Sequence, residues 1–291
     1  MQIVTDSGTD VGLSPEELAD LNITIVPLTV TLDGKTYREG IDIEPEAFYD
    51  LLDASGNMPT TSQPSAGDFA EVYRRFAEQG EEILSIHMSS GLSGTYNSAL
   101  AAAKLVPEAK VTHYDTKTLT AAAGWQVRAA AQVIKAGGSV EDALALARRI
   151  GDAAESIYTL NDLSYLIHGG RISHMKGLIA SVLNLKPIIG VEKVNGTYVQ
   201  MGQARTFKRA LQGLVERAKT FYPAGSEVYT QVLYSFNPEG GQMLRDLVDK
   251  TYKCHWLPMG PMSLVLGAHT GRTMVGLGIA SAEVMEQVFG A

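Results

Sequence analysis

The first half of the sequence alternates between short β-rich runs and helical patterns. The β-rich runs are residues 2–5, 23–32, 82–87 and 110–114, and the last two are each followed by a helical stretch. Such alternation is typical of a parallel sheet, because a chain that returns to add a parallel strand needs a crossover, which is usually a helix. The first half is therefore predicted to be an α/β domain built on a parallel sheet.

The pattern changes past about residue 157. Residues 187–201 predict a hairpin, in which Asn195-Gly196 stands between two β-type runs and suits a type I′ turn. The rest is predicted to contain a helix over 207–219, a strand over 228–234, a helix near 243–248, strands near 263–268 and 273–279, and a short terminal helix. We therefore expect an N-terminal α/β domain of residues 1–155 and a mixed α+β C-terminal domain of residues 156–291.

The composition excludes several classes of protein. The chain has 291 residues, of which 45% are hydrophobic and 19% charged, as in a globular protein of about two domains. Its net charge of −8 disfavours a nucleic-acid partner or an anionic membrane surface. No apolar run reaches the roughly 18 residues of a membrane span, and the N-terminus lacks the basic and apolar regions of a secretion signal. We expect a cytoplasmic protein without integral membrane association.

The sequence also lacks the usual motifs for metals and nucleotides. The single cysteine, Cys254, cannot form an intramolecular disulfide or a cysteine metal cluster. No G-x-G-x-x-G follows residues 2–5, and no G-x-x-x-x-G-K-[ST] occurs. No pair at metal-ligand spacing is found among the six histidines, which are His87, His113, His168, His174, His255 and His269. We therefore expect neither a metal nor a cofactor.

Two segments stand at predicted helix starts. Residues 61–63 precede a helix whose start is indicated by Ser65 and Asp68, which are spaced as in a capping box. Residues 89–95 (SSGLSGT) follow a strand and open a second helix. The free N–H groups of a helix N-terminus attract anions, and Ser93 adds a hydroxyl.

Two other interpretations of Ser93 are open. It caps the helix, or it is a nucleophile, as in the elbow of α/β-hydrolases. The elbow motif is G-x-S-x-G, whereas the residue two positions after Ser93 is Thr95. A serine-dependent acyl or ester hydrolase therefore remains the alternative function.

Five short motifs run through both halves of the chain. They are VTDS at 4–7, TSQPS at 61–65, SSGLSGTY at 89–96, GGRIS at 169–173 and KPI at 186–188. In this order they resemble the DegV family. The resemblance implies two α/β domains with a long-chain fatty acid, such as palmitate, in a cleft and tunnel between them. It also implies a non-catalytic, acyl-carrying subunit of a bacterial fatty-acid kinase system, in which a separate kinase subunit phosphorylates the bound carboxylate with ATP.

The resemblance also assigns the residues that bind the carboxylate. The set is Thr61, Ser62, Ser93, Gly94, Arg171 and His269. The hydroxyls of Thr61 and Ser93 would donate to the carboxylate, and Arg171 would supply positive charge. One position departs from the family pattern, because Arg272 stands where a proline commonly follows H-T-G.

The physics of a buried fatty acid agrees with such a site. A carboxylate that leaves water needs several donors, since burial without partners is costly. The tail of palmitate would contribute roughly 11 kcal/mol before association costs, at about 0.8 kcal/mol per methylene. Tail burial would then give most of the affinity, and the polar residues would orient the head. A third possibility is a structural or regulatory module whose pocket stays empty.

Overall fold

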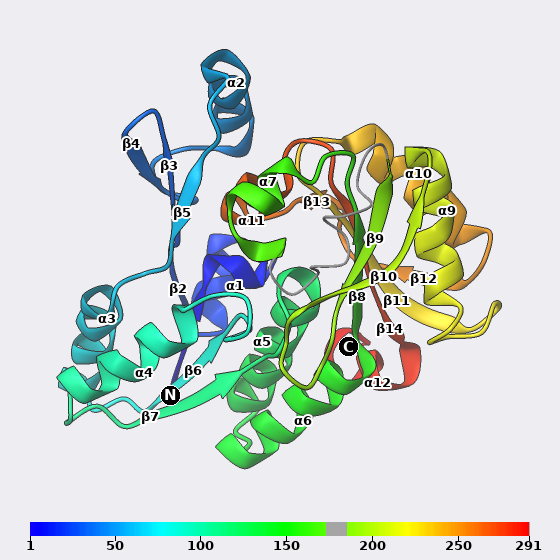
Figure 1. Ribbon diagram of the computed structural model, residues 1–291. Coiled ribbons are helices and arrows are strands. Elements are labelled where there is room, and N and C mark those ends of the chain that lie inside the picture. Colours follow the sequence, from blue (N-terminus) through cyan, green and yellow to red (C-terminus); the bar gives the residue numbers. More distant parts are fainter. Residues whose placement is uncertain (173–184, 291) are drawn as a thin grey trace.

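The computed structural model describes residues 1–172 and 185–290, which form two halves (Figure 1). The first half contains β1 (Gln2–Asp6), η1 (Ser7–Thr9), α1 (Pro15–Asp20), β2 (Ile23–Val26), β3 (Thr29–Leu32), β4 (Lys35–Arg38), α2 (Pro45–Ser55), β5 (Thr60–Ser62), α3 (Ala66–Glu78), β6 (Ile83–His87), α4 (Thr95–Leu105), β7 (Val111–Asp115), α5 (Thr120–Lys135) and α6 (Val140–Ala153). The second half contains β8 (Glu155–Thr159), α7 (Ser164–His168), β9 (Lys186–Val191), β10 (Tyr198–Ala204), α9 (Phe207–Ala218), β11 (Glu227–Tyr234), α10 (Pro238–Asp249), β12 (Lys253–Trp256), β13 (Gly260–Pro261), α11 (Leu264–Thr270), β14 (Val275–Ser281) and α12 (Ala282–Phe289). Ser173 of the GGRIS motif lies outside the described residues.

The first half is built on the predicted parallel sheet. Its order is β2-β1-β6-β7, and every neighbouring pair is parallel. The prediction of a single strand over residues 23–32 is wrong. It is two strands, β2 in the parallel sheet and β3 in a separate antiparallel sheet of order β4-β3-β5. Pro27 lies between them and has no N–H with which to continue a ladder. The small sheet and α2 project from the rest of the first half (Figure 1).

The second half is mixed, as predicted. Its sheet has the order β10-β9-β8-β14-β11-β12, and β13 also pairs with β11. The pairs of β11 with β12 and β13 are parallel, and the other pairs are antiparallel. The α/β fold class expected from the sequence is thereby confirmed, with a parallel sheet and further sheets.

Two local predictions for the second half are wrong. Residues 263–268 were expected to form a strand, but α11 is a helix whose residues are all buried. A helix buried on every side shows no polar face, so its period is hidden in the sequence. The hairpin of β9 and β10 forms, but its turn is not type I′. Gly196 has a positive φ of 69° and Asn195 does not, whereas type I′ requires both.

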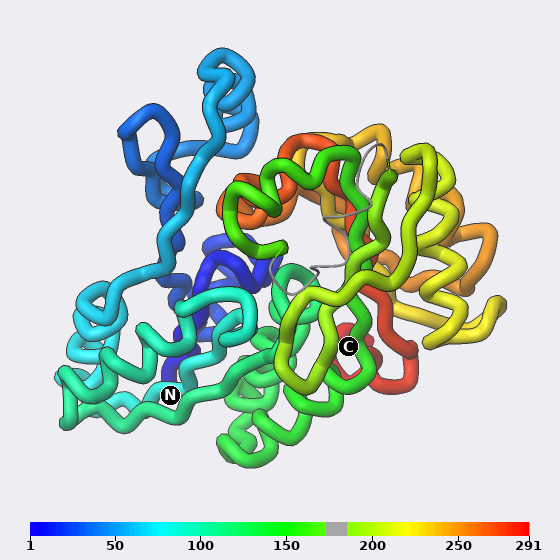
Figure 2. The backbone as a smooth tube through the Cα atoms, in the orientation of Figure 1, coloured from blue at the N-terminus to red at the C-terminus, as the bar shows by residue number. Residues whose placement is uncertain are grey.

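Helix α5 joins the cores of the two halves. Its Val127 and Ala130 pack with Ile3 beside the parallel sheet. Its Trp125 packs instead in the core that includes residues of the second half, and the indole Nε1 donates a hydrogen bond of 3.1 Å to Gln231 Oε1. Figure 2 follows the backbone from α5 through α6 into β8. The predicted end of the first domain at residue 155 is the first residue of β8, just after α6, and the domain boundary stays a prediction.

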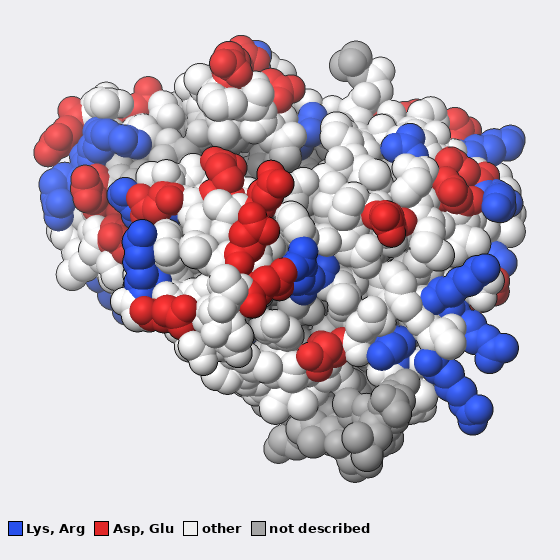
Figure 3. Space-filling model, turned by 90° about the horizontal axis from the view of Figure 1, so that it is seen from above, with Lys and Arg blue, Asp and Glu red and all other residues white. Residues whose placement is uncertain are grey.

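Charged side chains are spread unevenly over the face shown in Figure 3. Most Lys and Arg side chains in this view lie toward the second half, and many Asp and Glu side chains lie over the left and middle. Among the described helices, none combines the length and the apolar character that crossing a membrane requires.

Candidate functional site

A small cavity of about 30 Å³ lies between the two halves, and its wall combines hydrophobic residues with a cluster of polar ones. We call it the polar cavity for that cluster. Four of the predicted site residues line it, namely Thr61, Ser93, Arg171 and His269. They come from β5, from the loop before α4, from the segment after α7 and from α11. The fold thus brings together motifs that are up to 208 residues apart in the sequence.

Thr61 contacts His269 directly. Thr61 Oγ1 and His269 Nε2 are 2.7 Å apart and form a hydrogen bond. Thr61 was expected in a loop but lies on strand β5, where successive side chains point to opposite faces. Ser62 is therefore exposed and does not line the cavity.

Ser93 lies half-buried at the start of α4. Its Oγ is 2.8 Å from Thr95 Oγ1 and accepts a hydrogen bond of 3.3 Å from the Thr95 backbone N–H. The N-cap residue is Gly94, so the interpretation of Ser93 as the N-cap is wrong by one residue. A Cβ on Gly94 would lie 2.4 Å from Gln63 Oε1, so the amide end of Gln63 packs against the place where a larger residue would have its side chain.

His269 is neutral in this environment. Burial, together with the charges of Arg171 and His168, lowers its pKa to about 4. Its Nδ1 is buried and has no hydrogen-bond partner among the described residues. A Cβ on Gly169 would lie 2.1 Å from that nitrogen. The first glycine of the GGRIS motif therefore makes room for the imidazole ring.

Arg171 brings positive charge to the cavity. Its side chain is half-buried, and its Nη1 donates a hydrogen bond of 2.5 Å to the Gly169 carbonyl. The preceding Gly170 has a φ of 73°, a conformation that other residues rarely adopt. The backbone at the two glycines thus turns the guanidinium toward the cavity that His269 also lines.

An apolar cavity adjoins the polar one. The two share Tyr198 and Leu266 in their walls. Apart from Thr270 the apolar cavity is lined by hydrophobic residues, which are Leu119, Tyr158, Leu160, Leu166, Ile189, Tyr198, Met262, Leu266 and Met274. These positions are scattered over the chain without a common motif, so no pattern in the sequence predicts them. The cavity measures about 20 Å³, which is room for about one water molecule. A long ligand therefore requires its walls to move, and Met262 and Met274 are adaptable side chains.

A larger polar cavity of about 90 Å³ lies near the end of β7. Two of its lysines are already paired with carboxylates. Lys117 is 2.9 Å from Asp115, and Lys193 is 2.7 Å from Glu155. It therefore combines paired charges with little that could bury an apolar chain.

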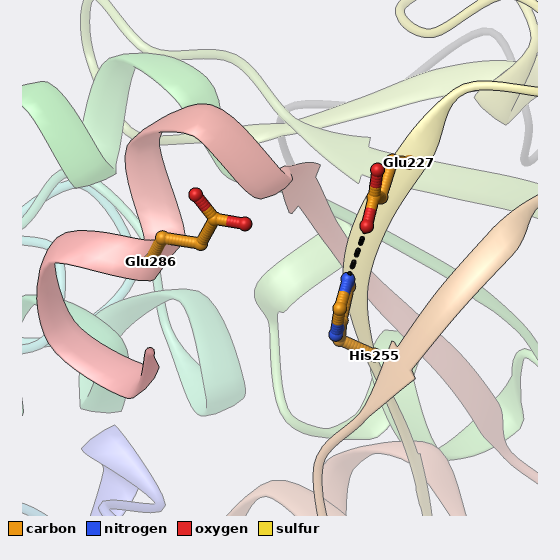
Figure 4. A group of neighbouring side chains, drawn as sticks. All are labelled: Glu227, His255 and Glu286. Atoms are coloured by element: carbon orange, nitrogen blue, oxygen red, sulfur yellow. Dashed lines mark hydrogen bonds and ion pairs between the residues drawn. The ribbon is translucent and has the colours of Figure 1, made fainter. Parts of the chain in front are cut away.

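One further cluster groups a histidine with two carboxylates (Figure 4). Glu227, His255 and Glu286 come from β11, β12 and α12, and their possible ligand atoms lie within 4.8 Å of one another. His255 Nε2 is 2.7 Å from Glu227 Oε1, as the dashed line shows. Both glutamates are exposed, and none of the three residues lines the cavities between the halves.

Comparison with known proteins identifies the family. The family model described as "Uncharacterised protein, DegV family COG1307" matches residues 1–282. The chain belongs to the DegV family. A DegV domain-containing protein of Staphylococcus aureus is 32% identical over 275 residues, which cover 94% of this chain and 96% of the relative.

Solved structures of other DegV proteins have the same fold. A fatty-acid-binding DegV protein from Thermus thermophilus has a TM-score of 0.85 and 31% identity, over 96% of this chain and 99% of that one. DegV from Bacillus subtilis, described as a fatty acid binding protein, has a TM-score of 0.85 and 28% identity, over 96% and 98% of the two chains. A stearic-acid-binding protein from Eubacterium ventriosum has a TM-score of 0.81 and 27% identity, over 97% and 98%.

Proposed function

We propose that this DegV protein is a non-catalytic, cytoplasmic carrier of a long-chain fatty acid. The polar cavity would hold the carboxylate, and the adjoining apolar cavity would open to hold the tail. The observation that carries the proposal is the junction of the two cavities at Tyr198 and Leu266, with Thr61, Ser93, Arg171 and His269 on the polar side. The fatty-acid binding of the Thermus thermophilus and Bacillus subtilis proteins supports it.

The polar residues would orient the carboxylate. A neutral His269 that carries its proton on Nε2 donates to Thr61 Oγ1, and the Thr61 hydroxyl is then free to donate to the ligand. Arg171 favours the anionic form of the head by its charge. Gly94 contributes by letting Gln63 approach, whereas the side chain of Ser62 faces away.

We further propose that the bound carboxylate is presented to a separate kinase subunit, which forms the acyl phosphate. The carboxylate oxygen would attack the terminal phosphate of ATP that the partner holds, with ADP as the leaving group. This chain has no P-loop motif of its own. Its part would be to bind the tail and to aim the head, neither of which requires a nucleophile.

The hydrolase alternative requires a different set of hydrogen bonds. A nucleophilic serine needs a base, which a third group orients. In the described structure Ser93 bonds Thr95, and His269 bonds Thr61. The observed geometry therefore favours the carrier over the hydrolase.

The test is native mass spectrometry of protein from a bacterial host, followed by lipid extraction and titration of delipidated protein with palmitate and oleate. We expect a co-purified fatty acid. Thr61→Ala and Ser93→Ala should each lose one hydrogen bond to a charged group, about 1.5–3 kcal/mol. Acyl phosphate formation with a cognate kinase subunit should therefore fall more than tail-driven retention.

Thr60→Ala is the matched control, because Thr60 is exposed on the same strand as Thr61. It should change neither readout. Protein that never carries or takes up a fatty acid contradicts the proposal. Ester hydrolysis that disappears in Ser93→Ala would establish the hydrolase instead.

A further inference from the structure

Two carboxylates of the first half hold the N-terminal end of α11. The Ser263 backbone N–H donates to Asp10 Oδ1 over 2.8 Å, and Ser263 Oγ donates to Glu39 Oε2 over 2.8 Å. The backbone N–H of Leu264 donates to the second oxygen of Glu39. These hydrogen bonds join residues that are more than 220 positions apart in the sequence.

The two acidic residues are half-buried between the small sheet, η1 and α11. Asp10 Oδ2 is buried and has no hydrogen-bond partner among the described residues. Burial raises the pKa of both carboxyls, and the nearby Glu39 raises that of Asp10 further. Two buried carboxyls at one place are costly for stability. A contribution to stability alone is therefore a poor explanation for this pair.

Both carboxylates sit on anchored backbone. Asp10 has a φ of 44°, and its carbonyl oxygen would be 2.6 Å from a Cβ on Gly124 of α5. Glu39 donates its backbone N–H to the Leu28 carbonyl over 3.0 Å and forms an isolated bridge with Ile43. The pair is thus a fixed point of the first half against which α11 is placed.

Helix α11 connects Ser263 with the candidate site. His269 lies six residues after Ser263, which is about 9 Å along a helix axis. Every residue of α11 is buried, and a Cβ on Gly267 would lie 2.0 Å from the Tyr49 hydroxyl. A packed helix moves as a rigid body, so a shift at Ser263 displaces the His269 ring. The bond of 2.7 Å to Thr61 is lost when the ring moves by about 1 Å.

We propose that Asp10 and Glu39 are positioning residues of the carboxylate-binding site. They hold Ser263 and Leu264, and through α11 they set the imidazole of His269 against Thr61. The expected effect on fatty-acid affinity rests on the proposed function, because it requires that the fatty acid binds at this site. The effect on His269 itself does not depend on any ligand.

The test follows the His269 ring by NMR and palmitate binding by titration. His269→Gln assigns the ring signals in the delipidated protein. In the unaltered protein the ring should titrate near pH 4. In Glu39→Ala and Asp10→Ala it should titrate at least one pH unit higher, because the ring leaves its buried place. The Kd for palmitate should rise at least fivefold. Asp10→Asn keeps an acceptor for the Ser263 N–H and should restore both readouts.

Asp142→Ala is the control for a general loss of stability. Asp142 also holds a helix N-terminus, through Ser139, the N-cap residue of α6, but neither residue lines the cavities between the halves. Asp142→Ala should lower the Tm and should change neither the titration of the His269 ring nor the Kd for palmitate. If Glu39→Ala does not fold, Ser263→Ala removes only the hydroxyl contact and should shift the ring titration in the same direction.

The outcomes separate the two proposals. An unchanged His269 titration in Glu39→Ala, or in Ser263→Ala where that variant replaces it, overturns the positioning role. A shifted titration in a protein that binds no fatty acid overturns the proposed function and leaves the positioning role standing.

Discussion

Single residues decide how closely the motifs approach one another in the candidate site. Gly169 has no side chain, and the ring of His269 occupies the space that a side chain at position 169 would fill. A glycine in a motif can therefore indicate that another part of the chain packs closely against that position. The GGRIS motif supplies a cation at Arg171 and a space at Gly169.

Gly169→Ala should therefore impair ligand binding more than folding. The new Cβ would lie 2.1 Å from His269 Nδ1, so the ring has to move away from Thr61. We expect the Kd for palmitate to rise about tenfold, which is about 1.4 kcal/mol. Gly260→Ala is the matched control, since nothing lies within 4 Å of its Cβ. Equal affinities of the two variants in a titration would contradict the crowding argument.

His269 should also make stability depend on pH. Its pKa is lowered to about 4 in the folded chain from the ordinary value of 6.5, so the unfolded chain binds the proton more readily between these values. The free energy of unfolding should therefore fall as the pH falls from about 6.5 to 4, by at most about 3 kcal/mol. Urea unfolding of His269→Gln should show a weaker dependence in that window. His255→Gln, at an exposed ion pair, should follow the unaltered protein.

At the scale of elements, α2 and the small sheet are tied to the second half by Arg272. Its guanidinium pairs with Asp53 of α2 and lies 4.6 Å from the centre of the Phe236 ring. The departure from the family's proline thus adds a charge that is paired within the chain. The same region is joined to α11 by a core that includes Val30, Phe48 and Leu264.

Arg272→Ala should loosen this connection without unfolding the protein. Exposed ion pairs and cation–π contacts each contribute about 0.5–1 kcal/mol. We expect a loss of about 1 kcal/mol in the free energy of unfolding and faster amide exchange in α2. Lys110→Ala removes an exposed ion pair with Glu82 on the other side of the first half and serves as the control. A hydrogen-exchange map without any change in α2 would show that the pair does not hold this element.

At the scale of the whole molecule, the candidate ligand site spans both halves. Thr61 and Ser93 belong to the first half, whereas Arg171 and His269 belong to the second. A ligand that contacts all four residues binds only to the folded chain and not to the unfolded chain. Its binding free energy therefore adds to the stability of the folded state.

Palmitate should accordingly raise the Tm of delipidated protein. At a concentration 100 times the Kd the gain is about 2.7 kcal/mol. Hexadecanol, which has the same tail without the charge, should give a smaller rise because it cannot use Arg171. Thermal unfolding curves with each ligand measure the difference. Equal rises would show that the polar cavity does not recognise the carboxylate.

Local signals in the sequence determined much of the first half. Ser65 and Asp68 form the capping box that starts α3, as their spacing predicts. The parallel strands β1, β6 and β7 follow from short β-rich runs, and a helical pattern comes after those of β6 and β7. Helix α11 was missed because its neighbours bury it on every side. Such burial is a property of the tertiary structure and leaves no period in the sequence.

The sequence by itself determined the α/β class, the order of the motifs and the residue types of the polar site. Only the tertiary structure decided which of those residues meet. The strand β5 turns Thr61 toward the cavity and Ser62 away from it, and α11 carries His269 to Thr61 across 208 positions. The apolar walls and the Asp10–Glu39 pair are equally a matter of tertiary structure. Short-range propensities are encoded in neighbouring residues, whereas contacts between distant segments arise only when the packed core fixes their positions.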